Sequence, residues 1–580
     1  MITLRTSRVA RMDHEDRSLL GRLNRRCRDL RAPEVVMAPA RMGAARPTRY
    51  SFTRTLLRSA FRQGWLADRV ELDLDAEGRG RAIYRVETQG HEVHFVAFTD
   101  TLDESTHTDR VVAEAWEITA ALVDGPLSEE FLAELARSVP LQENGRLDPR
   151  VLVLTRGNRS VRFYEYLVDC LAAGQQPESD RVADAGYIMR STAFYGNGKF
   201  GMRSFLGYPD AHPLSVPYRA QFLTAWMFRE LSYDSVEHCA RARGGDSAVP
   251  FEAGWRRFFG LGNATGLGLV PYLFKHPQIL NSWVGVRELA LANVRALEGT
   301  EERVATLRRW IAKAHAHFSG IGGDDRPPWL GPRSLAAEVE RISEQFDSVA
   351  SRPQPFDALS RWAEGQGDET CEMVVSLLIE LDEGLTDEEV DELLLVDERI
   401  DYDPAMLVGD LRRVLESRFG WINEMDLRGP DADHYWWVIS DNTEEPRRAE
   451  RRAVDPAHRE VAIDVALQVA GLRRLLAGVS DDTTLATLLV GNLDHEAAVR
   501  RVLGSDVPYG EPRDNACGAE FLPLEVQRFQ LAMYGLDNFA PKSTDWLRVT
   551  LFQGAPRIGE LAAPATDEWV WPTAPMEVSP

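Results

Sequence analysis

A glycine-rich segment over residues 187–204 carries the side chains best suited to hold a negatively charged group. Three glycines lie within six residues, beside an asparagine and one of only four lysines in the chain. Glycines at this density allow backbone N–H groups to converge on an anion, while lysine and arginine supply positive charge. The alternative is a Gly-Asn-Gly hairpin turn between strands over 188–195 and 200–205. The residues predicted to bind the anion are Arg190, Asn197, Gly198, Lys199 and Arg203.

A second glycine cluster lies over residues 259–277, with glycines at 260, 262, 266 and 268 before an apolar stretch. A glycine-rich loop that opens a helix would leave unpaired N–H groups facing a ligand. Close packing against another backbone is the alternative. The cluster is not a dinucleotide fingerprint, because Thr265 occupies the third glycine position. The first segment is no P-loop, because Phe200 replaces the Ser or Thr. The second cluster adds Asn263, Thr265 and Lys275 to the predicted binding residues.

Two histidines stand beside these segments, each directly before a proline, at His212-Pro213 and His276-Pro277. The residue before a proline is disfavoured in helix, so both imidazoles are expected in loops. Either could act as general acid or base near neutral pH, and a buried lysine with a lowered pKa could form a Schiff base. The predicted catalytic residues are therefore Lys199, His212 and His276.

Other histidines do not predict a metal site. His91 and His94 lie three apart in a predicted strand and should point to opposite faces. His315 and His317 lie two apart on a predicted helix, so their side chains should also point in different directions and cannot share one ion. A metal held by residues distant in sequence stays possible, but none is predicted, and the cofactor is unknown. The chain has no nucleophile elbow and no family signature that we recognise.

The composition limits what surrounds this chemistry. The 580 residues are 44% apolar and 27% charged, which is typical of globular proteins with about two to four domains. The net charge of −23 disfavours nucleic acid and anionic lipid as general partners. Five cysteines without a C-x-x-C pair, and no apolar run of about 18 residues, predict a cytoplasmic protein without membrane partners.

Period-two alternation and glycine turns predict strands in the first part of the chain. These strands cover 70–74, 82–86, 93–98 and part of 111–123, and helices are expected over 51–65, 129–137 and 161–172. Later apolar residues recur at helical spacing. The expected helices cover 218–241, 267–297, 301–318, 334–346, 371–381, 386–401, 406–419, 459–475 and 524–534, with a strand over 546–552.

The predicted fold class is α+β, with a small, mostly antiparallel N-terminal sheet domain followed by a predominantly α-helical body. Residues 1–49 read as a basic flexible arm, because 12 arginines face five acids in the first 50 residues. The further predicted regions are an α+β domain over 50–174, a glycine-loop and helical domain over 175–320, an acidic helical region over 321–430, and a mainly helical region with a loose tail over 431–580.

We expect an enzyme that acts on a small anionic metabolite held by the two glycine-rich segments, without a metal, as a lyase, isomerase or hydrolase. One alternative is a non-catalytic helical scaffold or interaction protein. Another is a nucleic-acid-associated regulator that uses the basic arm, although nucleic acid is disfavoured by the overall charge. The sequence is also compatible with a homo-oligomer.

Overall fold

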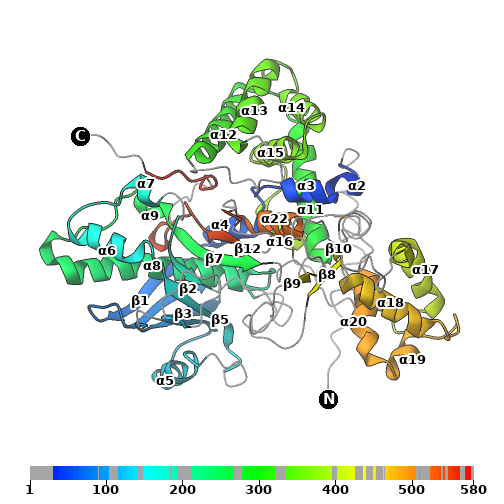
Figure 1. Ribbon diagram of the computed structural model, residues 1–580, viewed down its shortest axis with the longest axis horizontal. Helices are drawn as coiled ribbons and strands as arrows, with labels where there is room; N and C mark the ends of the chain where they lie inside the picture. The colour runs from blue at the N-terminus through cyan, green and yellow to red at the C-terminus, as the bar shows by residue number, and fades with distance from the viewer. Residues whose placement is uncertain are drawn as a thin grey trace.

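The computed structural model places most of the chain in one sheet and several groups of helices (Figure 1). The structure describes residues 30–88, 90–102, 115–141, 148–182, 186–191, 208, 212–266, 277–320, 334–394, 402–424, 435–438, 449–451, 461–462, 464–504, 509, 523–536, 540–541, 546–561 and 568–575.

Nine described strands form the main sheet, in the order β1-β2-β3-β4-β5-β6-β7-β12-β11. All neighbouring pairs are antiparallel except β6 and β7. This confirms the mostly antiparallel sheet and the α+β class. The strands are β1 (Leu66–Leu74), β2 (Gly80–Thr88), β3 (His91–Thr99), β4 (Ile118–Asp124), β5 (Val151–Arg159), β6 (Tyr187–Ser191), β7 (Gly260–Gly266), β11 (Ala540–Pro541) and β12 (Trp546–Leu551).

The sheet is larger than the small N-terminal domain that the sequence predicts. Its strands β6, β7, β11 and β12 come from beyond residue 174, so the predicted boundary at that residue falls within a continuous sheet. The reason is that β7 and β12, almost 300 residues apart in the chain, pair over six positions from Trp546–Gly266 to Leu551–Leu261. Local sequence patterns carry no information on such long-range pairing.

Helices cover both faces of the sheet. The long helix α8 (Arg219–Gly244) crosses one face, and α5 (Glu129–Ser138) covers the other (Figure 1). Successive side chains of β3 point to opposite faces of the sheet, so each face offers apolar residues to a helix. Phe95 and Ala97 join the core on the α8 side, and Val96 packs with the apolar residues of α5. Two more helices lie near α8, namely α6 (Tyr164–Ala172) and α9 (Trp255–Phe258).

Three strands have a terminus at one edge of the sheet, because β3 begins there, β4 ends there and β5 begins there. Val123 of β4 pairs with Val151, the first residue of β5, so β4 ends where β5 begins. Because β6 is antiparallel to β5 and β7 is parallel to β6, β6 and β7 run towards that edge, although β6 ends at Ser191 opposite Gly157 and does not reach it. We call this the site edge. The predicted anion-binding segments follow β6 and β7 directly in the chain.

The second glycine cluster is in part a strand rather than a loop. Residues 260–266 form β7, with Gly260, Gly262 and Gly266 on the same face. A Cβ at Gly262 would come within 2.6 Å of the ring of Tyr187 on the neighbouring strand. These glycines therefore permit close packing within the sheet, which corrects the expectation of a loop opening a helix for residues 260–266. The helix expected over 267–297 begins, among described residues, at Pro277.

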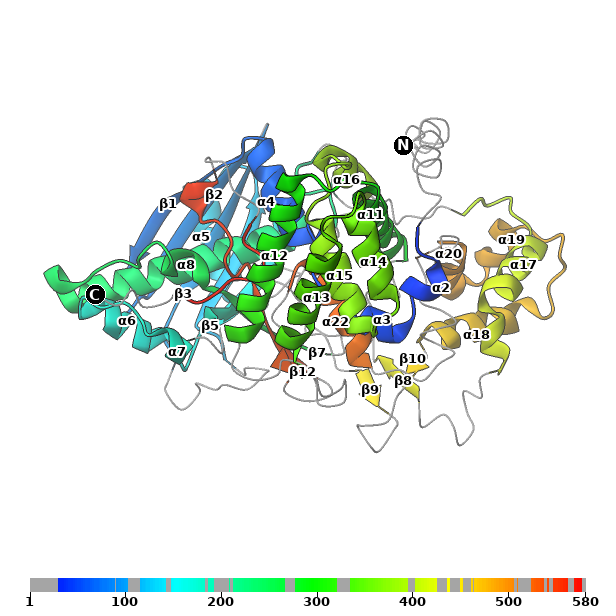
Figure 2. The same cartoon turned by 90° about the horizontal axis from the view of Figure 1, so that it is seen from above.

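The helical body lies beside the sheet, and a further group of helices lies beyond it (Figure 2). The body contains α4 (Phe52–Arg62), α11 (Pro277–Arg295), α12 (Glu301–Gly320), α13 (Leu335–Val349), α14 (Pro355–Glu364), α15 (Asp368–Ile379), α16 (Asp387–Leu394) and α22 (Pro523–Tyr534). The outer group contains α17 (Val408–Phe419), α18 (Asp464–Leu476), α19 (Leu485–Val490) and α20 (Glu496–Gly504). A second small sheet holds β8 (Tyr435–Val438), β9 (Ala449–Arg451) and β10 (Val461–Ala462).

The described half of the predicted basic arm is packed against this body. Residues 30–49 contain two short helices, α2 (Pro33–Val36) and α3 (Pro39–Ala44), and Met42 is completely buried. Arg31 forms 2.7 Å ion pairs with Glu288 of α11 and Glu372 of α15. The arginines that suggested a free arm are thus used, in this half, to neutralise buried carboxylates. Residues 1–29 lie outside the described residues.

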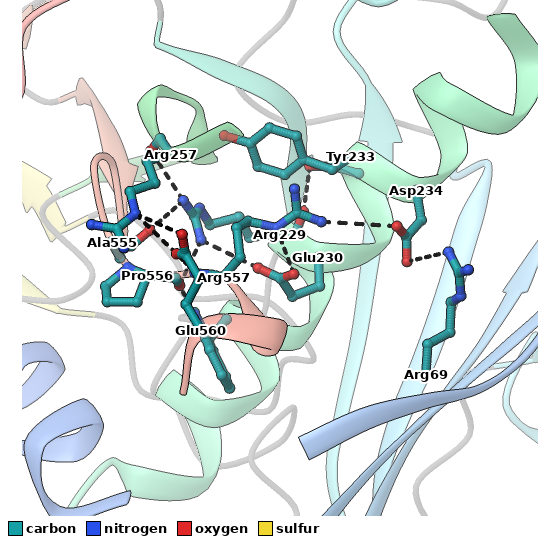
Figure 3. A network of polar contacts seen from close by, with 12 residues as sticks. Arg69, Arg229, Glu230, Tyr233, Asp234, Arg257, Ala555, Pro556, Arg557 and Glu560 are labelled. Carbon is teal, nitrogen blue, oxygen red and sulfur yellow. Dashed lines mark hydrogen bonds and ion pairs between the residues drawn. The ribbon is translucent and has the colours of Figure 1, made fainter. Parts of the chain in front are cut away.

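A network of ion pairs and carbonyl contacts holds the C-terminal segment against α8 (Figure 3). The fully buried Arg229 donates to the carbonyl oxygens of Phe259, Arg257, Ala555 and Pro556, over 2.8–3.2 Å. Beside it, Arg557 donates to the buried carboxylate of Glu230 at 2.6 Å. This Arg229–Glu230 network joins β7, α8 and the chain that follows β12 into one unit.

Candidate functional site

Three side chains capable of proton transfer or ligand binding converge at the site edge. One ligand atom from each of His91, Asp124 and His212 lies within 4.8 Å of the other two. His212 is almost completely buried, whereas His91 and Asp124 are partly exposed. The site is therefore open to solvent on the side of His91 and Asp124 and closed behind His212.

The strands place two of these side chains on one face. His91 begins β3, and Asp124 ends β4 opposite Val93, two residues further along β3. Residues two apart on a strand share a face, so His91, Val93 and Asp124 project towards the α8 side. His94 projects to the other face, where its Nδ1 lies 3.0 Å from the carbonyl oxygen of Gly125. The prediction that His91 and His94 cannot share a ligand is thus supported by the register.

His212 reaches the site from the turn that leads into α8. The N–H of Ser215 donates to the carbonyl of His212 at 3.0 Å, and Leu214 and Val216 are buried. Arg219, the first residue of α8, fixes the turn to the body through Ser59 of α4 and Asp391 of α16. The Ser215–His212 bond and the anchor at Arg219 together restrict the orientation of the imidazole.

The hydrogen bonds of His212 define which ring nitrogen carries its proton. The backbone N–H of Leu214 donates to Nδ1 at 3.1 Å, so Nδ1 is the acceptor and neutral His212 carries its proton on Nε2. Nε2 lies 3.4 Å from Oδ2 of Asp124, but no hydrogen bond to Nε2 is formed among the described residues. A buried N–H without a partner calls for an explanation, although other buried side-chain atoms among the described residues, such as Nε of Arg287, share this property. Here it points at a carboxylate beside solvent.

Aromatic rings confine the imidazole further. The ring of Tyr208 stacks on His212 with centroids 4.9 Å apart and planes 16° apart. His91 meets the same ring edge-on at 4.7 Å. Behind the sheet, burial lowers the pKa of His94, although the Glu92 carboxylate 3.3 Å away acts in the opposite direction. Nε2 of His212 therefore faces Asp124, at 3.4 Å.

The three residues are of types that bind transition metals, but the donor set does not fit. Two histidines and a carboxylate are a common ligand set. A metal needs an unprotonated ring nitrogen, and a ligating histidine normally donates its other N–H to an acceptor. In His212 the lone pair of Nδ1 is engaged by Leu214 and Nε2 carries the proton. The geometry favours proton transfer and hydrogen bonding over metal binding.

Four of the predicted site residues are described. His212 lies in the site. Arg190 lies in β6, half-buried, opposite Gly262 of β7. Asn263 lies in β7, 3% exposed, with its amide nitrogen unpaired among the described residues. Thr265 lies in β7 opposite Leu547. Arg190 pairs with Asn158 of β5, beyond the level at which β4 begins, so Arg190 and the neighbouring Asn263 lie towards the opposite end of the strands from Asp124. The register therefore does not bring these two residues to His212.

The other predicted residues lie outside the described residues. They are Asn197, Gly198, Lys199, Arg203, Lys275 and His276. The described strands nevertheless fix where their segments begin, since Ser191 and Gly266 are the last residues of β6 and β7.

Sequence reasoning missed Asp124 and the part played by His91. Asp124 has no local motif, because its partners come from another strand and from a distant turn. His91 was considered only together with His94. One sequence pattern could have indicated the role of His91. The alternation of β3 places His91 and His94 on opposite faces, so His91 can contact residues of other elements without His94.

Comparison with known proteins identifies no relative. No protein-family model, curated protein or solved structure matches this chain. Among the described helices, none combines the length and apolar character needed to cross a bilayer.

Proposed function

We propose that the protein is an enzyme that carries out acid–base chemistry on a small anionic metabolite at the site edge, without a metal. The observation that carries this proposal is the buried Nε2–H of His212, which lies 3.4 Å from the Asp124 carboxylate and forms no hydrogen bond with the described residues. Buried histidines with a structural role normally have both ring nitrogens hydrogen-bonded. An N–H donor without such a bond, beside a carboxylate, suits general acid–base chemistry.

The glycine-rich segments supply the anion site in this proposal. Lys199, with Arg190 or Arg203, would hold the negative group, and Asn197, Gly198, Asn263, Thr265 and Lys275 would line the same hollow. The support is the strand direction, because β6 and β7 are parallel neighbours that run towards the edge carrying His91 and Asp124. The described part of β6 ends at Ser191 opposite Gly157, so the residues that follow it would have to continue to that edge. His276 would lie in the second segment as a further acid–base group.

A cytoplasmic location would suit the thiols of Cys170, Cys239 and Cys371, because these three form no disulfide bond among the described residues. The nucleic-acid alternative loses support from the packing of Arg31 and Arg41, whose charges face the carboxylate of Glu372.

The test is a thermal-shift screen of small carboxylates and phosphates against the wild-type protein, Lys199→Ala and Lys313→Ala. Lys313 is a matched control, since it lies on α12 with its ammonium group 5.4 Å from the Trp310 ring centre. A ligand at about 100 times its Kd adds roughly 2.7 kcal/mol of stability. We expect a shift in the wild type and Lys313→Ala that is lost in Lys199→Ala. No shift with any anion, or an equal shift in Lys199→Ala, would contradict the proposal.

A further inference from the structure

The proton arrangement of His212 restricts the reaction that this site can perform. In its neutral form the imidazole has no free lone pair, because Nδ1 accepts the Leu214 N–H and Nε2 carries the hydrogen. It can therefore donate a hydrogen bond but cannot accept a proton without breaking the contact to Leu214. Within the pair, the only proton acceptor is the carboxylate of Asp124.

We infer that His212 acts as a hydrogen-bond donor and Asp124 as the base, and that the substrate is a small anionic carbonyl compound that loses a proton from the carbon beside its carbonyl group. This rests on the proposed function and names its substrate class. A neutral imidazole N–H that faces a carbonyl oxygen stabilises the negative charge developing there.

The step balances without a further reactant. Asp124 takes the proton from the α-carbon, and the electrons of that C–H bond form a C=C bond to the carbonyl carbon. The π electrons of the carbonyl group move to its oxygen, which accepts the hydrogen bond from Nε2–H of His212. Return of the proton from the carboxylic acid to carbon restores the carbonyl compound.

The distances suit this division of roles. Nε2 and Oδ2 are 3.4 Å apart, so an oxygen that accepts from Nε2 would place its neighbouring carbon atoms beside the carboxylate. Contacts with Tyr208 and His91 restrict the plane of the His212 ring. Arg219, which donates to the carbonyl oxygen of Pro213, helps to fix the position of the turn that carries the ring. A hydrolase in which His212 activates water or a hydroxyl would instead need an unprotonated Nε2.

The first experiment measures the tautomer directly. Ring-¹⁵N-labelled histidine is incorporated into the full chain, and nitrogen shifts are recorded at about pH 8, where imidazoles are neutral. The His212→Phe variant assigns the signals of His212 by their loss. We expect a protonated Nε2 and an unprotonated Nδ1. A protonated Nδ1 would overturn the inference and leave the proposed anion-binding enzyme intact, because the thermal-shift screen tests that separately.

The second experiment follows the chemistry. Pyruvate, 2-oxoglutarate and dihydroxyacetone phosphate are incubated with the protein in D₂O, and exchange of their α-hydrogens is followed by proton NMR. We expect exchange with at least one probe to fall about 100-fold or more in Asp124→Asn and in His212→Phe. His212→Gln, which retains an N–H donor, should lose less.

Glu92→Gln serves as the carboxylate control, since Glu92 lies on the opposite face of β3 beside His94. Its exchange rate should equal that of the wild type. Exchange that is equal in the wild type, Asp124→Asn and His212→Phe, or absent with every probe, would overturn the carbonyl assignment.

Discussion

Two buried polar clusters of this protein differ in how completely their groups are paired. In the Arg229–Glu230 network, all three guanidinium nitrogens of Arg229 donate, and both carboxylate oxygens of Glu230 accept (Figure 3). In the candidate site, the Nε2–H of His212 has no hydrogen-bond partner among the described residues. The cost of an unpaired buried group is of order 1–3 kcal/mol, so each such group calls for an explanation. What sets His212 apart from others, such as Nε of Arg287, is that its N–H faces a partly exposed carboxylate. The incomplete cluster is therefore the one to test for function.

The largest effect should come from breaking the complete network. Glu230→Ala leaves Arg229 and Arg557 without their shared carboxylate in a buried setting. Loss of one partner from a buried ion pair costs about 3–5 kcal/mol. Glu237→Ala, on the same helix, removes a partly buried acceptor of the Phe251 N–H and should cost about 1 kcal/mol. Thermal unfolding midpoints measure both. Equal midpoints would show that the network is not structural.

A second buried cluster, around Glu372, predicts acid lability. Burial raises the pKa of Glu372, but Arg287 and Arg31 outweigh burial and hold that pKa at about 2, below the ordinary 4.5. A lowered pKa gives stability that is full above about pH 4.5 and is lost as the pH falls towards 2. The difference corresponds to about 3 kcal/mol.

Urea unfolding of the wild-type protein between about pH 5 and pH 2 tests this expectation. The wild type should lose stability over this range with a steeper slope than Glu372→Gln, which has no carboxylate to protonate. Parallel slopes in the two proteins would contradict the expected role of the carboxylate.

Changes at the candidate site should affect stability less. His212→Phe keeps a ring between Tyr208 and His91 but leaves the Leu214 N–H unpaired, which costs about 1–3 kcal/mol. The midpoint should therefore fall between those of Glu230→Ala and the wild type. A loss as large as that of Glu230→Ala would place His212 among the structural residues.

The smallest effect is expected at Asp124. Its side chain is 28% exposed, so Asp124→Asn should change the free energy of unfolding by about 0.5 kcal/mol or less. The rate of α-hydrogen exchange should nevertheless fall strongly in Asp124→Asn, because Asp124 is the proposed base. A clear loss of stability without loss of activity would reverse the distinction between the two clusters.

Local patterns predicted the elements better than their assembly. The apolar spacing over 218–241 corresponds to α8 at Arg219–Gly244, and the alternation over 93–98 corresponds to β3 at His91–Thr99. Both depend on contacts within a few residues. The pairing of β7 with β12 depends on chain segments that local patterns do not connect. Glycines at 260, 262 and 266 illustrate the limit, because the same residues suit a loop or a closely packed strand.

The residues of the candidate site show the same difference between local and long-range information. His212 was proposed as a catalytic residue from its position before a proline, which is a local property, and it belongs to the candidate site. Asp124 and His91 were not proposed, because only the antiparallel register of β3 and β4 brings them to one face and one edge. The residues that complete a site made by several strands therefore become visible only in the assembled sheet.

The most direct test is a crystal structure of the protein soaked with pyruvate. The account predicts a ligand oxygen within hydrogen-bonding distance of Nε2 of His212 and the methyl carbon beside the Asp124 carboxylate. Nε2 bonded to a protein group, with pyruvate bound elsewhere or not at all, would contradict it.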